Sequence, residues 1–237
     1  MTDPLSTLAD RVAKKLVSAP PHVVGIGGAV AVGKSTVAQA LAERFAARGR
    51  RVQIVATDAF LYPNAELEER GLTLRKGFPE TFDFDSMLAF ISEIRSGSAQ
   101  VSVPVYSHEI YDILPGERDV ISSPDLVLLE GVIALQSPVV DAIDVAIYVD
   151  AEEREVRAWF VTRFLELTEA ARSDAESFYR IFADMSLDEV RSIAEATWDS
   201  INGVNLREHI GPSRERATFI VSKAGDHSIA RIVDRQG

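Results

Sequence analysis

A glycine-rich turn that closes on a lysine constrains this chain more than any other stretch. Residues 25 to 36 read GIGGAVAVGKST, and Gly28, Gly33, Lys34 and Ser35 fit the pattern G-x-x-x-x-G-K-[ST]. An apolar segment typical of a strand precedes the pattern and a helical segment follows it, which is the context that the pattern requires. Backbone amides of such a loop and the helix N-terminus form a cradle for phosphate. A glycine turn with a surface lysine, the alternative, is far less consistent with this context.

The same loop predicts which atoms contact a nucleotide. Lys34 supplies a positive charge for the β- and γ-phosphates, and Ser35 supplies a hydroxyl for Mg²⁺. The competing dinucleotide-binding fingerprint fails, because it needs a third glycine where Val30 stands. The predicted nucleotide-binding residues of the loop are Gly28, Ala29, Val30, Ala31, Val32, Gly33, Lys34, Ser35 and Thr36.

Short apolar segments alternate with helical patterns along the rest of the chain. This alternation is typical of α/β proteins, in which helices cover a parallel sheet. We therefore predict a doubly wound, mostly parallel sheet of the P-loop NTPase and kinase fold. The predicted strands are 22–28, 51–57, 100–105, 125–129, 144–149 and 217–222, and the predicted helices are 35–48, 85–95, 152–168 and 187–201.

The length of the chain bounds its domain organisation. With 237 residues and 46% hydrophobic composition, it can bury one sizeable core but is short for two complete domains. We expect a single P-loop kinase domain over residues 1–237, with a lid-like helical region at about 152–203. Residues 61–83 lack a regular pattern, and a connection of this length is usually a functional loop.

Charge and composition exclude several classes of partner. The 25 basic and 36 acidic residues give a net charge of -11, which repels a nucleic-acid backbone. No apolar run has the length of a membrane span, and the N-terminal segment lacks the continuous apolar core of a signal peptide. The absence of cysteine excludes disulfides and thiolate metal sites. We expect a cytoplasmic protein that acts on a small molecule without nucleic-acid or membrane partners, with a homodimer as the candidate assembly.

Two carboxylates stand directly after predicted strands, at the edge of the sheet where ligands bind in α/β proteins. Asp58 follows RVQIVAT and could accept a proton from a substrate hydroxyl, or it could be an ordinary N-cap or turn aspartate. Glu130 follows DLVLL and suits a second contact to Mg²⁺ beside Ser35. Asp125 is excluded, because it begins that strand at the opposite end.

Other polar and aromatic side chains give weaker signals. The four histidines lack the spacing of metal ligands. Arg163 fits either a solvated surface charge or a residue of the lid that faces phosphate. The neighbouring pair Trp159 and Phe160 most simply packs one face of a helix.

Several segments beyond the phosphate loop resemble the bacterial type I pantothenate kinase family, within the phosphoribulokinase and uridine kinase group of P-loop kinases. They extend from about Val23 to His227 and read GAVAVGKST, ATDAFLYPNAELEERGL, RKGFPETFD, PVYSHEIYDI, LLEGVIALQ, IYVDA, RFL and INGVNLREHIGPSRERA. The resemblance implies ATP and Mg²⁺ as cofactors, with Asp58 facing the substrate hydroxyl. It further implies an acceptor side that contains Tyr106, His108, Tyr111, Phe160 and Asn202, a phosphate contact from Arg163 and a position near adenine for His227.

The chain departs from that family mainly around the acceptor pocket. The family's D-G-F-L has Ala59 here, its E-G-L-N has Ile133, and its W-Y has Phe160. Glu109 adds a carboxylate beside a histidine of the acceptor side. The family's N-terminal extension, and a segment between residues 136 and 144, find no match. Because Ile133 and Phe160 lack polar groups that the family has there, we expect pantothenate to be phosphorylated poorly, or less well than another small hydroxylated compound.

Together these features predict an ATP-dependent kinase that transfers the γ-phosphoryl group to a hydroxyl acceptor, with pantothenate as the leading candidate. Lys34, Asp58 and Arg163 are the predicted catalytic residues, and Ser35 and Glu130 the predicted Mg²⁺ contacts. Two alternatives stay open: a kinase of the same fold for a sugar, polyol or nucleoside, and a nucleotide-binding switch without phosphotransfer. Asp58 argues against the switch, which needs no carboxylate at the acceptor position.

Overall fold

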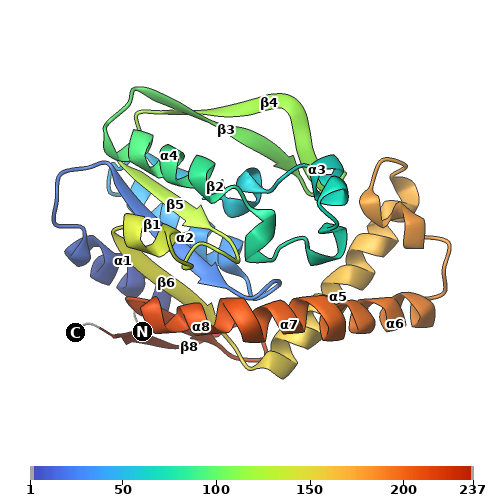
Figure 1. The fold of residues 1–237 in the computed structure, drawn as a ribbon. Helices are drawn as coiled ribbons and strands as arrows, with labels where there is room; N and C mark the ends of the chain where they lie inside the picture. The colour runs from blue at the N-terminus through green and yellow to red at the C-terminus, as the bar shows by residue number, and fades with distance from the viewer. Residues whose placement is uncertain (1–2, 236–237) are drawn as a thin grey trace.

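The computed structural model describes residues 3–235 (Figure 1). Its strands are β1 (His22–Gly28), β2 (Val52–Ala56), β3 (Gln100–Ser107), β4 (Asp112–Ser122), β5 (Leu126–Glu130), β6 (Val145–Asp150), β7 (Phe219–Lys223) and β8 (Ile229–Asp234). Its helices are α1 (Pro4–Lys15), α2 (Lys34–Ala46), α3 (Asn64–Glu69), α4 (Phe84–Arg95), α5 (Glu153–Ala170), α6 (Leu187–Thr197), α7 (Gly203–Asn205) and α8 (Gly211–Ser213). Within the described residues, no helix is long and apolar enough to cross a membrane.

The central sheet is six-stranded, with the strand order β2-β5-β1-β6-β7-β8. All neighbouring strands run parallel except β8, which pairs antiparallel with β7. The predicted α/β fold with a mostly parallel sheet is therefore confirmed. Because β5 lies between β1 and β2, the carboxyl ends of these three strands meet at one edge of the sheet.

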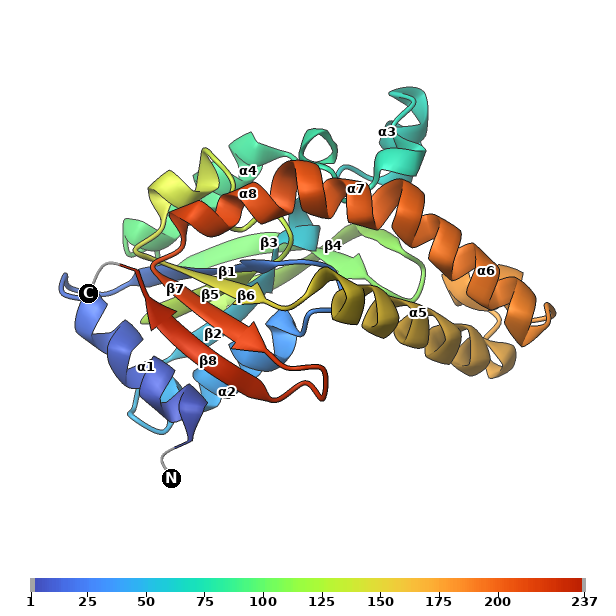
Figure 2. The same cartoon turned by 90° about the horizontal axis from the view of Figure 1, so that it is seen from below.

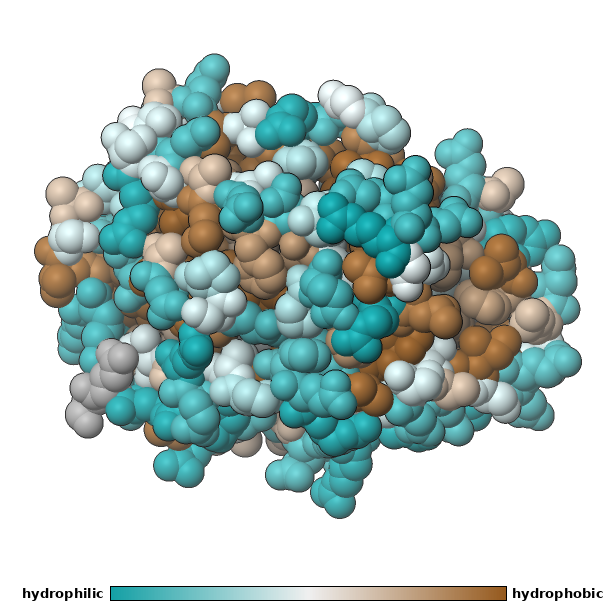
Figure 3. Space-filling model, viewed as in Figure 1, coloured by the Kyte–Doolittle hydropathy of each residue, from teal (hydrophilic) through white to brown (hydrophobic). Residues whose placement is uncertain are grey.

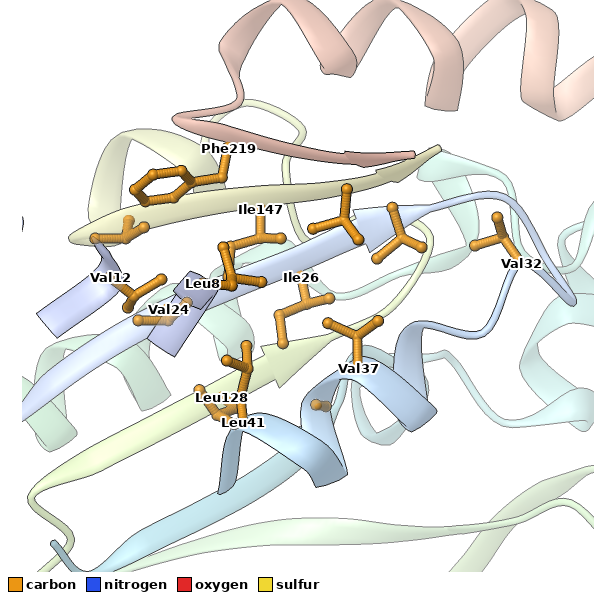
Figure 4. Packing of buried hydrophobic residues seen from close by; sticks show 14 of the residues in the cluster. Leu8, Val12, Val24, Ile26, Val32, Val37, Leu41, Leu128, Ile147 and Phe219 are labelled. Atoms are coloured by element: carbon orange, nitrogen blue, oxygen red, sulfur yellow. The ribbon is translucent and has the colours of Figure 1, made fainter. Parts of the chain in front are cut away.

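Successive residues of the central strands pack into two different cores, because side chains alternate between the faces of a sheet. Val24 and Ile26 of β1 face a core that includes Leu8 of α1 and Leu41 of α2 (Figure 4). Val23 faces the opposite core, which α4 covers together with β3 and β4. Figure 2 shows α1 and α2 on one side of the sheet and α4 and α8 on the other. Burial on both faces accounts for the continuous apolar runs of these strands.

The structure differs from the predicted strands at β3, β4 and β8. The predicted strand at 100–105 is real, but β3 pairs antiparallel with β4 in a separate two-stranded sheet instead of joining the parallel one. The sequence reasoning also missed β4 and β8. The resulting β3–β4 hairpin lies over α4 and reaches toward α3 (Figure 1).

Side-chain caps determine where two of the helices begin. Asp83 caps α4 by accepting a hydrogen bond from the amide of Ser86 at 2.9 Å. Ser186 and Glu189 form a reciprocal capping box at the start of α6. Such caps satisfy amides that have no partner inside the helix. The cap at Asp83 also ends the segment 61–83, which contains α3 and short 3₁₀ turns and is therefore more ordered than an irregular loop.

The helices α5 and α6 project beyond the end of the sheet (Figure 1). From α6 the helical backbone continues through α7 to α8, with π-helical turns at Trp198–Asn202 and Leu206–Ile210 between them. Single π turns inside helices often occur at functional sites. Exposed apolar side chains occur where the chain passes from α5 to α6, at Phe178, Ile181, Met185 and Leu187. In Figure 3 brown patches lie among teal and white surface at that end of the molecule.

Candidate active site

The glycine loop leaves β1 at Gly28 and enters α2 at Lys34. Gly28 and Gly33 have φ angles of 144° and 90°, and Ala31 has a φ angle of 62°. A Cβ atom on Gly28 would overlap the backbone carbonyl of Val149, so the loop passes too close to β6 for any other residue. No side chain caps the first turn of α2. The amides of this turn therefore have no side-chain partner, as expected for an anion cradle.

Lys34 lies inside this loop with only 8% of its surface exposed. Its Nζ atom donates a hydrogen bond to the backbone carbonyl of Ala29 at 2.9 Å. Burial lowers the pKa of the Lys34 ammonium, while the carboxylates of Glu130 and Asp58 act in the opposite direction and Arg163 lowers it further. Four charged groups predicted from the sequence therefore gather around one point, next to the phosphate cradle.

The two predicted Mg²⁺ contacts touch each other. Ser35 Oγ in the first turn of α2 donates a hydrogen bond to Glu130 Oε1 at the end of β5, over 2.8 Å. Among the described residues there is no cluster of three or more histidine, cysteine or acidic side chains that could hold a metal by themselves. A hydroxyl and one carboxylate suit a cation that takes its other ligands from phosphate and water, as Mg²⁺ commonly does.

Asp58 follows β2 directly, in the 3₁₀ turn Thr57–Phe60. No side chain caps that turn, and the Asp58 carboxylate makes no hydrogen bond with the described residues. Burial raises the pKa of Asp58, and the nearby charges of His108 and Lys34 lower it. A partly buried carboxylate without a hydrogen-bond partner does not fit a capping role. It fits a group that receives a proton from a substrate.

Three predicted acceptor-side residues come together on the β3–β4 hairpin. The ring of Tyr106 meets that of His108 at 5.1 Å and that of Tyr111 at 6.2 Å between centroids. Tyr106 and His108 also line a cavity of about 340 Å³ between β2 and the hairpin. Burial raises the pKa of both tyrosines, and the Asp58 carboxylate raises them further. Both phenols therefore stay neutral at physiological pH and can donate hydrogen bonds near Asp58.

The remaining predicted residues come from the helical region. Arg163 on α5 is exposed and forms no ion pair with the described residues, although its charge acts on Lys34. Phe160, one turn earlier, is partly buried with its ring 5.7 Å from that of Trp198. Asn202 lies in the first π turn, partly buried and without a hydrogen bond to the described residues.

His227 lies in the turn between β7 and β8, and its ring stacks on that of Trp159 at 4.1 Å. Nothing in this geometry tests the predicted position near adenine. The sequence reasoning missed Lys223, whose Nζ donates to the carbonyl of Val32 at 3.1 Å and would overlap a Cβ atom on Gly33. Lys223 is the last residue of β7. The rule that found Asp58, a polar residue at the end of an apolar strand, could have found it as well.

Comparison with known proteins gives concordant matches. The model of the Phosphoribulokinase / Uridine kinase family matches residues 23–163. A pantothenate kinase from Photorhabdus laumondii is 44% identical over 226 residues, covering 90% of this chain and 71% of that protein. A pantothenate kinase from Nocardioides is 45% identical over 222 residues, covering 88% of this chain and 68% of that protein. A solved kinase structure from Silicibacter sp. TM1040 matches with a TM-score of 0.71 and 26% identity, covering 87% of this chain and 93% of that chain.

Proposed function

The chain belongs to the Phosphoribulokinase / Uridine kinase family, and on that basis we propose that it is an ATP-dependent kinase that phosphorylates a hydroxyl group of pantothenate. One observation carries this proposal. Asp58, a carboxylate without a hydrogen-bond partner, lies between the lysine of the phosphate loop and the tyrosines of the hairpin. This is the position that a group must occupy to meet both a γ-phosphoryl group and an acceptor.

In the proposed reaction the chain's own residues orient the acceptor and offset charge. Asp58 aligns the acceptor hydroxyl and takes its proton as the bond from the acceptor oxygen to the γ-phosphorus forms and the bond from that phosphorus to the bridging oxygen breaks, which releases ADP. Lys34 and Arg163 offset negative charge on the transferring group. The pair Ser35 and Glu130 would hold Mg²⁺, which when bound neutralises charge on the β- and γ-phosphates. His227 is assigned to the adenine side, and Asn202 to the acceptor.

The helical region at about 152–203 acts as a lid in this proposal, within a single kinase domain over residues 1–237. This region carries Arg163. Just beyond the end of the region, at residue 205, a hydrogen bond connects the chain to the segment 61–83. Asn205 Nδ2 donates to the carbonyl of Gly77 at 2.8 Å. Closure of these parts over the nucleotide would exclude water, which would otherwise hydrolyse ATP. We place the reaction in the cytoplasm, where ATP is available, and a homodimer stays the candidate assembly.

A second candidate is a kinase for another small hydroxylated compound. Phe160 favours it, because a phenylalanine ring offers no hydrogen bond to a polar group of pantothenate. Under this hypothesis Phe160→Tyr raises turnover of pantothenate selectively. The switch hypothesis is less favoured, because a switch does not use a carboxylate at the position of Asp58.

The experiment is ADP release measured with Mg²⁺ against pantothenate, nucleosides, sugars and short polyols, followed by ³¹P NMR of the product. We expect pantothenate to give a phosphomonoester. Preferred turnover of another compound would favour the second candidate. Tight ATP binding without turnover of any acceptor would favour the switch and refute the proposal. A chain with Lys34→Met serves as the control for contaminating kinases.

A further inference from the structure

A second cavity, of about 210 Å³, lies at the edge of the sheet opposite the candidate active site. It is found where His22 begins β1 and Leu126 begins β5, whereas Asp58 and Glu130 stand at the other ends of their strands. The seven residues of β1 separate the two edges by about 20 Å, at about 3.3 Å per residue. This cavity shares no lining residue with the proposed nucleotide and acceptor sides.

The inner wall of this cavity is apolar and its rim is charged. The apolar lining residues come from the end of α1, from α2 and from β5, and they are Ala13, Leu16, Phe45 and Leu126. Phe45 and Leu126 are buried, whereas Arg48 and Arg50 at the rim are exposed. A cavity of this kind suits a small ligand that has an apolar body and one charged group.

The charge that the rim offers to a ligand is positive. Among the described residues that line the cavity, Asp125 is the only acidic one, and its carboxylate already accepts from the side chain of Arg51 at 2.8 Å. Arg48 pairs with Asp10 at 2.6 Å. The guanidinium of Arg50 forms no hydrogen bond or ion pair with the described residues. In a chain with a net charge of -11, this rim therefore presents an unneutralised guanidinium to an anion.

His22 provides a second polar group in the same cavity. Only 2% of its surface is exposed. Its Nδ1 atom lies 3.5 Å from Ser18 Oγ and 3.9 Å from Asp144 Oδ2, and neither of these residues lines the cavity. The ring thus turns its Nδ1 edge away from the cavity. The other ring nitrogen, Nε2, is buried without a hydrogen-bond partner among the described residues. Such an atom is uncommon, because leaving it unpaired costs free energy that a ligand atom could recover.

We propose that this cavity binds a small carboxylic acid with an apolar body, whose carboxylate accepts hydrogen bonds from His22 Nε2 and from Arg50. Ser18 Oγ then donates to Nδ1, which keeps the proton of the neutral ring on Nε2. The apolar body of the acid packs against Phe45 and Leu126. This inference does not depend on the proposed kinase activity. A depression that holds only solvent is the competing explanation.

The test uses hexanoate as the probe, with its neutral counterpart hexanamide and with inorganic phosphate. Calorimetry should show saturable binding of one hexanoate per chain. Hexanamide lacks the charge and phosphate lacks the apolar body, so each should bind at least about tenfold more weakly. Arg50→Gln should weaken hexanoate binding by about three- to tenfold, and His22→Phe by about tenfold. Arg191→Gln is the matched control, since it makes the same change on the exposed surface of α6, at the other end of the molecule (Figure 1).

Imidazole resonances in NMR locate the site without a substitution. Burial lowers the pKa of His22, Asp144 opposes this shift, and Arg50 and Arg95 lower the pKa further. A bound carboxylate adds a negative charge beside the ring and favours its protonated form. Hexanoate should therefore raise the pKa of His22. The guanidinium groups around the cavity stay protonated, and Asp125 stays ionised because Arg51 lowers its pKa to about 2, so neither accounts for such a shift near neutral pH.

Four outcomes would overturn the inference. Wild-type protein that shows no saturable binding of hexanoate leaves only a solvent-filled depression. Equal affinity for hexanamide or phosphate contradicts the class of ligand. Equal affinity of Arg50→Gln and Arg191→Gln for hexanoate removes Arg50 from the site. Shifted resonances of His108 with those of His22 unchanged would place hexanoate on the acceptor side. None of these measurements needs ATP or turnover, so their failure is distinct from a failure of the proposed function.

Discussion

Replacing Lys34 by methionine should separate the stability of this protein from its activity. Methionine fills a similar volume but carries no charge. In the folded chain burial opposes the Lys34 ammonium, and its pKa is lowered despite the nearby carboxylates of Asp58 and Glu130. A lowered pKa means that the charged form is less favourable in the folded than in the unfolded state. Among the described residues, Lys34 Nζ makes a single hydrogen bond, to the carbonyl of Ala29, and the substitution removes it. We therefore expect Tm to be unchanged or slightly raised.

Activity should change in the opposite direction. Removing one preorganised group that stabilises transition-state charge costs about 3 to 4 kcal/mol, or about 10²- to 10³-fold in kcat. The assay is ADP release at saturating ATP and acceptor, with Tm from differential scanning fluorimetry. Lys14→Met on the exposed surface of α1 is the control. Turnover within about tenfold of wild type would refute the reasoning, and so would a large fall in Tm, which would make the loss of activity a loss of fold.

Two further substitutions test the role of Asp58 and the packing around Gly131. Asp58→Asn should lower turnover by about 10²- to 10⁴-fold, with the affinity for ADP in calorimetry nearly unchanged. Because burial raises the pKa of Asp58, wild-type kcat/KM should fall with decreasing pH at a midpoint above the ordinary aspartate value of about 3.9. The variant should lack this fall at low pH. Unchanged turnover would return Asp58 to a structural role. Gly131→Ala should lower Tm by about 2–10 °C, because the added Cβ atom would overlap the buried side chain of Thr57. Adding Thr57→Ala to this variant should recover part of the loss. An unchanged Tm in Gly131→Ala would contradict the packing.

The parallel strands were predictable because the two faces of the sheet are both buried. Apolar runs such as that of β5 have few other stable arrangements. The strand β4 was not, since its sequence DILPGERDVIS contains proline, glycine and charges, and most of its residues are exposed. It forms because β3 offers a partner through a short turn. For such a strand, pairing within the folded chain overrides local preference.

The candidate site likewise contains residues that the local sequence predicts and residues that only the fold brings together. Asp58 and Glu130 could be proposed from the local sequence, because each stands where an apolar strand ends, at the carboxyl edge of the sheet. Lys76 lies in a segment without a regular pattern, and Tyr111, whose backbone carbonyl accepts a hydrogen bond from Lys76 Nζ, is 35 residues away. Only the folded chain brings the two together. The resemblance to a family singled out Tyr106, His108 and Tyr111, but it did not predict the contacts that fix these side chains in place.

The structure also separates two departures that the sequence treats alike. Ile133 is completely buried in the core that α4 covers. With no exposed surface it offers no contact to an acceptor in this structure, and its expected effect on pantothenate binding stays a prediction. Phe160 is partly buried near Trp198, and its place on the acceptor side stays a prediction. One unsatisfied polar group costs about 1–3 kcal/mol, which is about five- to 150-fold in affinity. A loss of that size weakens pantothenate as an acceptor without excluding it. Phe160→Tyr should therefore lower the KM for pantothenate by no more than this factor.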